Sequence, residues 1–487
     1  MQRALVTVLL LAAALSAAQS KSANKAPKNQ SGSSFPITTS SAQARDLFEK
    51  GMQDYENLYL ERCIQDWRDA AAADPNFALA HAWVAFSSND PAEVAKERAK
   101  AKALESNATP GEKLMIEWIV NVQENNFVAG IAAMNDMLAT YPKDKRLLYL
   151  AGNWLMGEQE DEHAGKMMEK ALKIDKNYPA ALNDLAYAHA RVGDFPPAFA
   201  AMERYIKVLP NEPNPQDSYA EILRMSGDFE GALKHYRAAL KIYPKFHSSQ
   251  VGLADTYALM GDEPRARAEY DKASQQDEDE TNRLNYALQS AMTWVRENKF
   301  EEADKAFNAV AEKAHAEGID LLEARAYRMM AMYQEQDVTA LNHLEQAEDA
   351  LGHSQNTSQS DREEERSRIL RLRVARALHG GNRKEANHAL HQLQTLAKGS
   401  RSTVIQQSYH AAEGTMLVAQ EKFSEAISNL QEDSNDPYSL ELLSRAYRET
   451  GSSDDVTSVE SRLRAINTPT MEQALVVVPA RAKRPTN

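Results

Sequence analysis

The 487-residue chain contains one cysteine, Cys63, so no disulfide can form within it in any compartment. Its stability therefore has to come from packing. Basic residues are fewer than acidic ones. The chain has 56 Lys and Arg residues and 70 Asp and Glu residues, so its formal net charge is −14. A chain this acidic repels phosphate backbones, which argues against nucleic acid as its principal ligand.

Sequence motifs of catalysis are missing as well. There is no glycine-rich phosphate loop, no Gly-x-Ser-x-Gly elbow and no His-Glu-x-x-His pair. The nearest approach to a metal site is His388 and His391, three residues apart and so on one helix face, with His379 and His410 in neighbouring segments. No carboxylate accompanies them in a ligand pattern, so we expect no metal, no cofactor and no enzyme activity. A His-dependent metal protein or enzyme is the alternative.

Alternating Val- and Ile-rich runs, the pattern of β-strands, do not occur. Apolar residues make up 43% of the chain, and Ala, Leu, Glu and Lys are frequent, which favours helix. We therefore expect an all-α protein.

The chain does have a repeat of 34 residues. Five successive stretches carry a small residue, a large residue four positions later and a third residue three positions after that. The small residues are Gly130, Ala164, Ala198, Ala232 and Ala266, the large ones are Met134, Met168, Met202, Tyr236 and Tyr270, and the third ones are Met137, Ala171, Tyr205, Ala239 and Ala273. Trp118, Gly152, Ala186, Ala220 and Ala254 open the stretches.

These residue types suit pairs of antiparallel helices, because two helices approach closely only where neither presents a long side chain. Gly193, Gly227 and Gly261 mark the turn within a pair, and Pro142, Pro210 and Pro244 close three of the stretches. The pattern resembles the tetratricopeptide repeat, a helix-turn-helix unit. The resemblance implies a right-handed superhelical solenoid that acts as a scaffold for protein–protein interaction.

The repeat suggests how the chain is organised. The expected segments are a signal peptide (1–18), a disordered leader (19–40), a repeat solenoid (41–351) with a regular core (110–277), a polar linker (352–361), irregular repeats (362–466) and a flexible basic tail (467–487). About eleven hairpins fit between Ser41 and Ile466. Cys63 occupies a small-residue packing position of the first repeat, so we expect it to be buried.

The N-terminus has the layout of a cleaved secretory signal peptide. Arg3 precedes the apolar run Ala4–Leu15, and the small residues Ser16, Ala17 and Ala18 follow. The run is short for a membrane span, and an uncleaved anchor is the alternative. No cysteine follows the small residues, which excludes a bacterial lipoprotein. We expect a bacterial periplasmic or secreted protein without a membrane span after cleavage.

In proteins with this repeat, the first helix of each pair lines a concave groove. The resemblance places the partner contacts at Tyr149, Asn153, Asn183, Tyr187, Asp217, Glu221 and Asp255. No lysine is present among them to clamp a carboxylate, and three of them are acidic. We therefore expect a protein or peptide partner, possibly basic. A structural role in an envelope complex, through the convex face or the ends of the solenoid, is the alternative, and the oligomeric state is left open.

The signal-peptide interpretation predicts where the mature protein begins. N-terminal sequencing of the exported protein should start near Gln19 or Lys21, because cleavage follows the small residues. A mature protein that still carries Arg3 would show that the apolar run is an anchor.

Overall fold

The computed structural model describes residues 35–57, 59–354 and 357–482. The expected signal peptide and most of the expected leader lie outside these residues. Within them every regular element is a helix, which confirms the all-α fold. Among the described helices, none is both long enough and apolar enough to cross a membrane.

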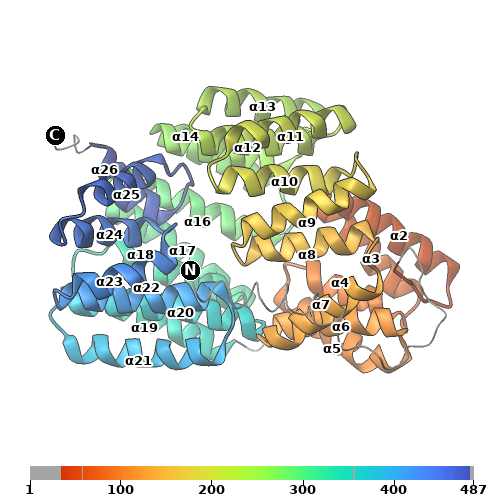
Figure 1. The fold of residues 1–487 in the computed structure, drawn as a ribbon, viewed down its shortest axis with the longest axis horizontal. Coiled ribbons are helices and arrows are strands. Elements are labelled where there is room, and N and C mark those ends of the chain that lie inside the picture. The colour runs from red at the N-terminus through yellow and green to blue at the C-terminus, as the bar shows by residue number, and fades with distance from the viewer. Residues whose placement is uncertain (1–34, 58, 355–356, 483–487) are drawn as a thin grey trace. The chain divides into compact units, whose positions relative to one another are not determined.

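The chain divides into two compact units, Met1–Val192 and Gly193–Asn487, and each is described by itself (Figure 1). The helices of unit 1 are α2 (Ala42–Glu56), α3 (Leu60–Ala73), α4 (Ala78–Ser87), α5 (Pro91–Leu104), α6 (Pro110–Gln123), α7 (Phe127–Thr140), α8 (Lys145–Gly157), α9 (Asp161–Ile174) and α10 (Pro179–Arg191), with a 3-10 turn, η1 (Glu105–Asn107).

The helices of unit 2 are α11 (Phe195–Val208), α12 (Pro213–Ser226), α13 (Phe229–Ile242), α14 (His247–Met260), α15 (Glu263–Gln276), α16 (Glu280–Arg296), α17 (Phe300–Glu317), α18 (Asp320–Tyr333), α19 (Asp337–His353), α20 (Gln359–His379), α21 (Arg383–Gly399), α22 (Thr403–Ala419), α23 (Phe423–Leu430), α24 (Pro437–Glu449), α25 (Ser453–Ala465) and α26 (Val478–Ala482). Two short turns of helix, η2 (Gln431–Asp433) and the π-helical η3 (Gln473–Val477), complete it.

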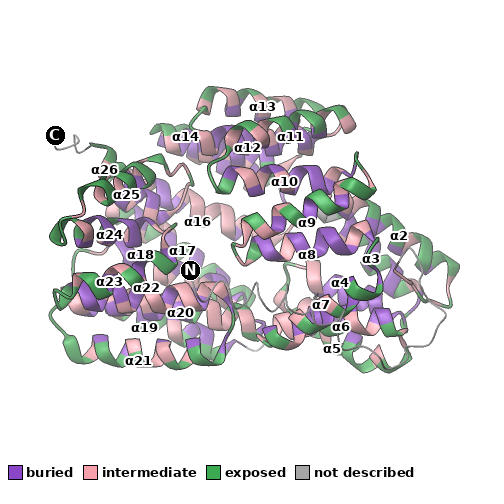
Figure 2. Ribbon diagram, in the orientation of Figure 1, coloured by how far each residue is buried: buried purple, intermediate pink, exposed green. Residues whose placement is uncertain are grey.

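The helices pack in sequential pairs, such as α8 with α9 and α12 with α13. Every residue of the 34-residue series is buried, which confirms the repeat. Where the small residue of the first helix is glycine, it lies against a large residue sixteen positions later. A Cβ on Gly152 would lie 2.6 Å from Met168 Cε, and one on Gly414 would lie 2.6 Å from Leu430 Cγ. The irregular C-terminal pairs thus include the same contact, and buried stripes follow the sides of the helices that face their neighbours (Figure 2).

Left-handed backbone conformations mark the turn between the two helices of a pair. Gly193, Gly227 and Gly261 have φ values of 81°, 92° and 81°. The same position of the two preceding repeats holds Asn125 and Gln159, with φ values of 57° and 60°. The repeat therefore imposes this conformation even where the residue is not glycine, although other residues adopt it at a cost.

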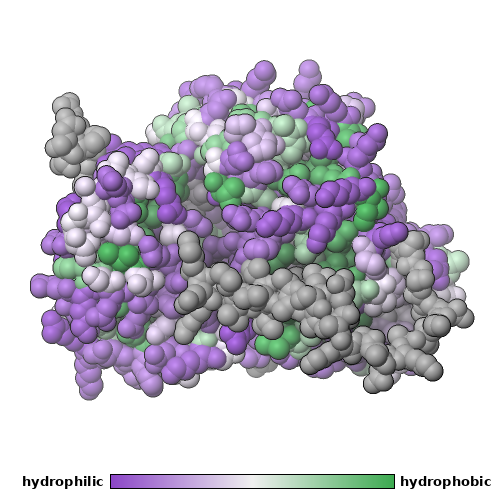
Figure 3. All heavy atoms as spheres, in the orientation of Figure 1, coloured by the Kyte–Doolittle hydropathy of each residue, from purple (hydrophilic) through white to green (hydrophobic). Residues whose placement is uncertain are grey.

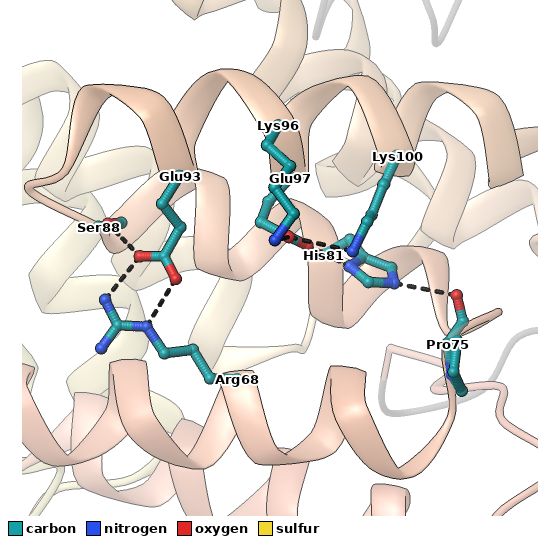
Figure 4. A network of polar contacts seen from close by, with 8 residues as sticks. All are labelled: Arg68, Pro75, His81, Ser88, Glu93, Lys96, Glu97 and Lys100. Carbon is teal, nitrogen blue, oxygen red and sulfur yellow. Dashed lines mark hydrogen bonds and ion pairs between the residues drawn. The ribbon is translucent and has the colours of Figure 1, made fainter. Parts of the chain in front are cut away.

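A polar network joins the first two pairs of unit 1 (Figure 4). Arg68 of α3 makes two hydrogen bonds, of 2.8 and 2.6 Å, to the carboxylate of Glu93 on α5. His81 of α4 is 2% exposed; its Nε2 lies 3.0 Å from the carbonyl oxygen of Pro75, and its Nδ1 contacts the carboxylate of Glu97 on α5. Burial favours a raised pKa for Glu97, but hydrogen bonds from His81 and two lysines outweigh it and the pKa is lowered. A charged carboxylate therefore holds α5 to α4.

The ends of the described chain differ from the expected leader and tail. Residues 35–40 make hydrogen bonds to the carboxylates of Asp144, Glu112 and Asp74, as detailed below. The expected flexible tail is wrong for the described part of residues 467–487, because residues 473–482 form η3 and α26. Apolar side chains explain the difference, since Met471 and Val477 are 2% and 0% exposed. Helix α20 also begins at Gln359, inside the expected polar linker.

The turn geometry predicts opposite effects for two matched substitutions. Gly261→Gln should lower the free energy of unfolding by about 1–2 kcal/mol, because it places a Cβ in the left-handed region. Gln159→Gly should raise it by a smaller amount, about 0.5 kcal/mol, since glycine also loses more backbone entropy on folding. Urea unfolding followed by circular dichroism would measure both. A loss of stability in both variants would contradict this account of the turn.

Candidate partner-binding sites

In unit 1 the predicted groove residues lie on α8 and α10, and Asn153 links the two helices. Asn153 Nδ2 of α8 donates a 3.0 Å hydrogen bond to Asp184 Oδ2 of α10, and Asn183 Nδ2, on the same helix as Asp184, donates one of 3.0 Å to Oδ1. Asp184 is 4% exposed, and burial raises its pKa. Tyr149 is 2% exposed, and Tyr187 is half-buried. Tyr149 and Asn183 are therefore buried between helices of the repeat.

In unit 2 the predicted residue Asp217 is also buried. It lies on α12, is 8% exposed and accepts a 2.6 Å hydrogen bond from Ser249 Oγ of α14. Burial raises the pKa of Asp217 to about 7, against a lowering effect of the Ser249 hydrogen bond. Near neutral pH a large share of this carboxyl group is uncharged.

The other two predicted acidic residues of unit 2 surround a buried cation, Arg224. Its guanidinium contacts Asp255 Oδ2 at 2.6 Å and Glu221 Oε1 at 3.1 Å. Tyr270 Oη donates a 2.5 Å hydrogen bond to the other oxygen of Asp255. Burial alone would lower the pKa of Arg224, but its neighbours outweigh burial and raise it. The negative charge of Asp255 is therefore balanced by the positive charge of Arg224.

These contacts reduce the negative charge of the predicted groove residues. Near neutral pH Asp217 is only partly ionised, and Arg224 offsets one of the two charges of Asp255 and Glu221. The physical reason is that each first helix packs between neighbouring helices. The positions three residues before Gly152, Ala186 and Ala220, which are Tyr149, Asn183 and Asp217, are therefore buried. Arg224 and Asp184 are missing from the predicted set. The sequence does contain a pattern that could have identified them. Asn153 and Asp184 are 31 residues apart, and so are Arg224 and Asp255, which is about the length of one repeat.

A cavity of about 320 Å³ lies among the first helices of unit 1. Helices α2, α4, α6 and α8 all contribute to its walls, so it opens on the face that the first helices share, which we call the inner face of unit 1. Seven apolar side chains of these helices line it, each at most 5% exposed. They are Phe48, Met52, Leu79, Trp83, Met115, Leu147 and Leu150.

Charged residues of α2 and α8 border this cavity. Arg146 of α8 contacts the carboxylate of Glu56 and lies 3.1 Å from Glu49 Oε2, both on α2. Lys145 is paired at 2.8 Å with Asp175 Oδ2. The ion pairs of Arg146 tie the first pair of helices to the fourth, and so they fix the width of the cavity.

An extended segment of the chain itself, residues 35–40, crosses the inner face of unit 1 beside the cavity. Phe35 and Ile37 form part of the cavity lining. The segment is held through its backbone, because three of its N–H groups donate to carboxylates of three successive repeats. Asp144 is the N-cap of α8, Glu112 lies in the first turn of α6, and Asp74 is the C-cap of α3. The hydrogen bonds run from Phe35 N to Asp144 Oδ2 (2.8 Å), from Thr38 N to Glu112 Oε1 (2.6 Å) and from Ser40 N to Asp74 Oδ2 (3.2 Å).

The histidines of the C-terminal third do not converge on a metal site. His388 and His391 are exposed on α21, whereas His379 Nδ1 bonds to Asp337 and His410 Nδ1 to Asn429. In the described part of the chain, no three His, Cys, Asp or Glu side chains are grouped so that they could hold a metal ion. Cys63 is fully buried as expected, and burial raises the pKa of its thiol to about 12.

Residues 223–291 match the family model of the tetratricopeptide repeat. The chain contains tetratricopeptide repeats. Its matched segment runs from the end of α12 into α16, and the repeat of helix pairs continues on both sides of it. This fold is one of protein-interaction scaffolds.

Solved structures similar to this chain include Tom70 from yeast, which is 15% identical with a TM-score of 0.42 over 86% of this chain and 95% of that one. The APC/C hetero-tetramer Cut9–Hcn1 is 14% identical with a TM-score of 0.43 over 93% and 81%. A tetratricopeptide repeat protein from Parabacteroides merdae is 14% identical with a TM-score of 0.37 over 63% and 99%. No curated protein matches the chain in sequence.

Burial of Asp217 predicts a pH-dependent effect of Asp217→Asn. The folded-state pKa of about 7 lies above the ordinary value of 3.8, so the folded state binds more protons between these values and stability falls as pH rises. The asparagine side chain does not ionise, so it avoids this loss. The free energy of unfolding of the variant should be higher than that of the natural chain by roughly 2–4 kcal/mol at pH 8 and by little at pH 4.

Urea unfolding at the two pH values measures this difference. The matched control is Asp271→Asn, which removes the same charge from an exposed position of α15. An equal effect of the two substitutions at pH 8 would show that Asp217 is not held in the uncharged form.

Proposed function

We propose that this protein is a non-catalytic scaffold that binds an extended segment of a protein partner on the inner face of unit 1. The observation that carries the proposal is the 320 Å³ apolar cavity beside a segment already bound there in extended form. The volume lies at the lower end of the range of ligand pockets, which suits one or two large apolar side chains. Such buried anchors supply most of the affinity of many interfaces.

The contacts of residues 35–40 support a backbone-directed mode of binding. The carboxylates of Asp144, Glu112 and Asp74 accept hydrogen bonds from main-chain N–H groups, which every residue except proline provides. Affinity gained in this way does not depend on the partner's sequence. Specificity would come from the side chain that enters the cavity.

The proposal includes a place for the interaction. The signal-peptide pattern of residues 1–18 supports export, so the partner would be met in the cell envelope or outside the cell. The partner is a protein or a peptide, and the inner face of unit 1 does not require it to be basic.

A structural role through other surfaces is the competing proposal, and it needs a continuous apolar area outside the inner face. Single apolar side chains are exposed at Val128, Ile174 and Val338. On the face drawn in Figure 3, hydrophilic residues predominate and hydrophobic ones show in separate patches. These observations favour the inner face of unit 1 as the docking surface.

Site-specific photocrosslinking in the exporting cell tests the proposed function. A photoreactive residue in place of Lys143, which is exposed at the cavity, should capture a discrete partner. The same residue in place of Lys166, exposed on the second helix α9, is the matched control and should not capture it. Capture at Lys166 alone would favour the structural role.

Once the partner is identified, Leu150→Trp should fill part of the cavity and exclude an apolar side chain of the partner. The loss of this one anchor should weaken binding by about 2 kcal/mol or more. Isothermal titration would measure it. Unchanged affinity in a variant that keeps its helical circular dichroism would exclude the cavity as the anchor site.

A further inference from the structure

The C-terminal segment of the chain, residues 467–482, covers helices of unit 2 that lie far from it in sequence. Met471 is 2% exposed and belongs to an apolar cluster with Leu284 and Leu288 of α16 and Met329 of α18. Val477 is fully buried in a second cluster, formed by α22 to α25. One short segment thus bridges two apolar clusters of unit 2.

Polar contacts fix the same segment. Arg296 at the end of α16 donates to the carbonyl oxygen of Thr470 at 3.5 Å, and Asn467 Nδ2 donates to the carbonyl oxygen of Met225, at the end of α12, at 3.2 Å. Glu472 lies close enough to Arg328 to favour its charged form. The surface under the segment is therefore apolar with a cationic border.

The segment fits this surface imperfectly at one residue, Gln473. Its side chain is 0% exposed, and neither its amide nitrogen nor its amide oxygen has a hydrogen-bond partner among the described residues. A buried unpaired amide loses its hydrogen bonds to water and gains none in return. The backbone at this point is π-helical, from Gln473 to Val477. Such π-helical turns are rare and occur often at functional sites.

These features are not those of a simple end cap. A segment that only closed the last repeat would contact α24 and α25 alone. This one contacts both and also reaches Arg296 of α16, 174 residues before Thr470. A cap would also carry apolar side chains at its fully buried positions. Val477 is one, but Gln473 is equally buried and polar, so the segment binds this surface less tightly than it would with an apolar residue there.

We propose that this surface of unit 2 is a docking site for an amphipathic helical segment of a partner protein, and that residues 470–477 occupy it in the free chain. The occupant shows the chemistry that the site accepts. The partner carries apolar residues in place of Met471, Ala474, Val476 and Val477, an acidic residue in place of Glu472, and an apolar residue in place of Gln473. Because it leaves no amide unpaired, it displaces the chain's own segment.

Synthetic peptides test the site without knowledge of the partner. The probe is a fluorescein-labelled peptide of residues 467–482 with Gln473→Leu, and its binding to the full chain is followed by fluorescence anisotropy. The peptide of natural sequence should bind at least tenfold more weakly, because it buries the unpaired amide. A probe that also carries Met471→Asp should not bind, since it puts a charge into the apolar cluster of α16 and α18.

Two variants of the full chain then alter the chain's own segment. In the full chain, Met471→Asp should weaken the contacts of the chain's own segment, so the labelled Gln473→Leu peptide should bind at least tenfold more tightly. Gln473→Leu in the full chain should strengthen those contacts, so the same peptide should bind at least tenfold more weakly. If Met471→Asp fails to fold, the comparison of the natural chain with Gln473→Leu decides. No binding of the labelled Gln473→Leu peptide, or equal binding to all folded chains, would overturn the proposal.

Discussion

The close approach of two helices at a small residue is the contact on which the rest of the structure depends. A glycine of the first helix lies against a large residue of the second at both regular and irregular pairs, as Gly152 does against Met168 and Gly414 against Leu430. Without a disulfide, and with a net charge of −14 that opposes compaction, the chain has to gain its stability from this packing, repeated along each unit. The inner face of unit 1 and its cavity exist because these contacts set the spacing between first helices.

The sequence predicted the helix pairs well because packing at close contacts depends on residue size. All residues of the 34-residue series are buried, and the turns at Gly193, Gly227 and Gly261 adopt the left-handed conformation that glycine favours. The pattern even extends to Gly414 and Leu430, where the spacing between repeats is longer. Size and period are local properties, and they can be read without knowledge of the tertiary contacts.

The site was predicted less well because exposure depends on neighbours in three dimensions. Asp217 and Asn183 were placed in an open groove by analogy, yet both are buried against neighbouring first helices. The cavity of unit 1 was missed because its walls come from four repeats at irregular spacings. Residues 35–40 and 467–482 were judged by the polar composition around them, although a few apolar residues, Phe35 and Met471 among them, are enough to hold these segments in place.

The polar pairs between successive first helices have a consequence for the evolution of the chain. Asn153 requires Asp184 in the next repeat, and Arg224 requires Asp255. A repeat moved to another place in the array would bring a buried charge without its counterpart, which is far more costly than a poor apolar fit. The repeats therefore share a shape but are not interchangeable. Their order is encoded in the protein interior, so duplication or deletion of a single repeat would be tolerated only where these polar pairs are absent.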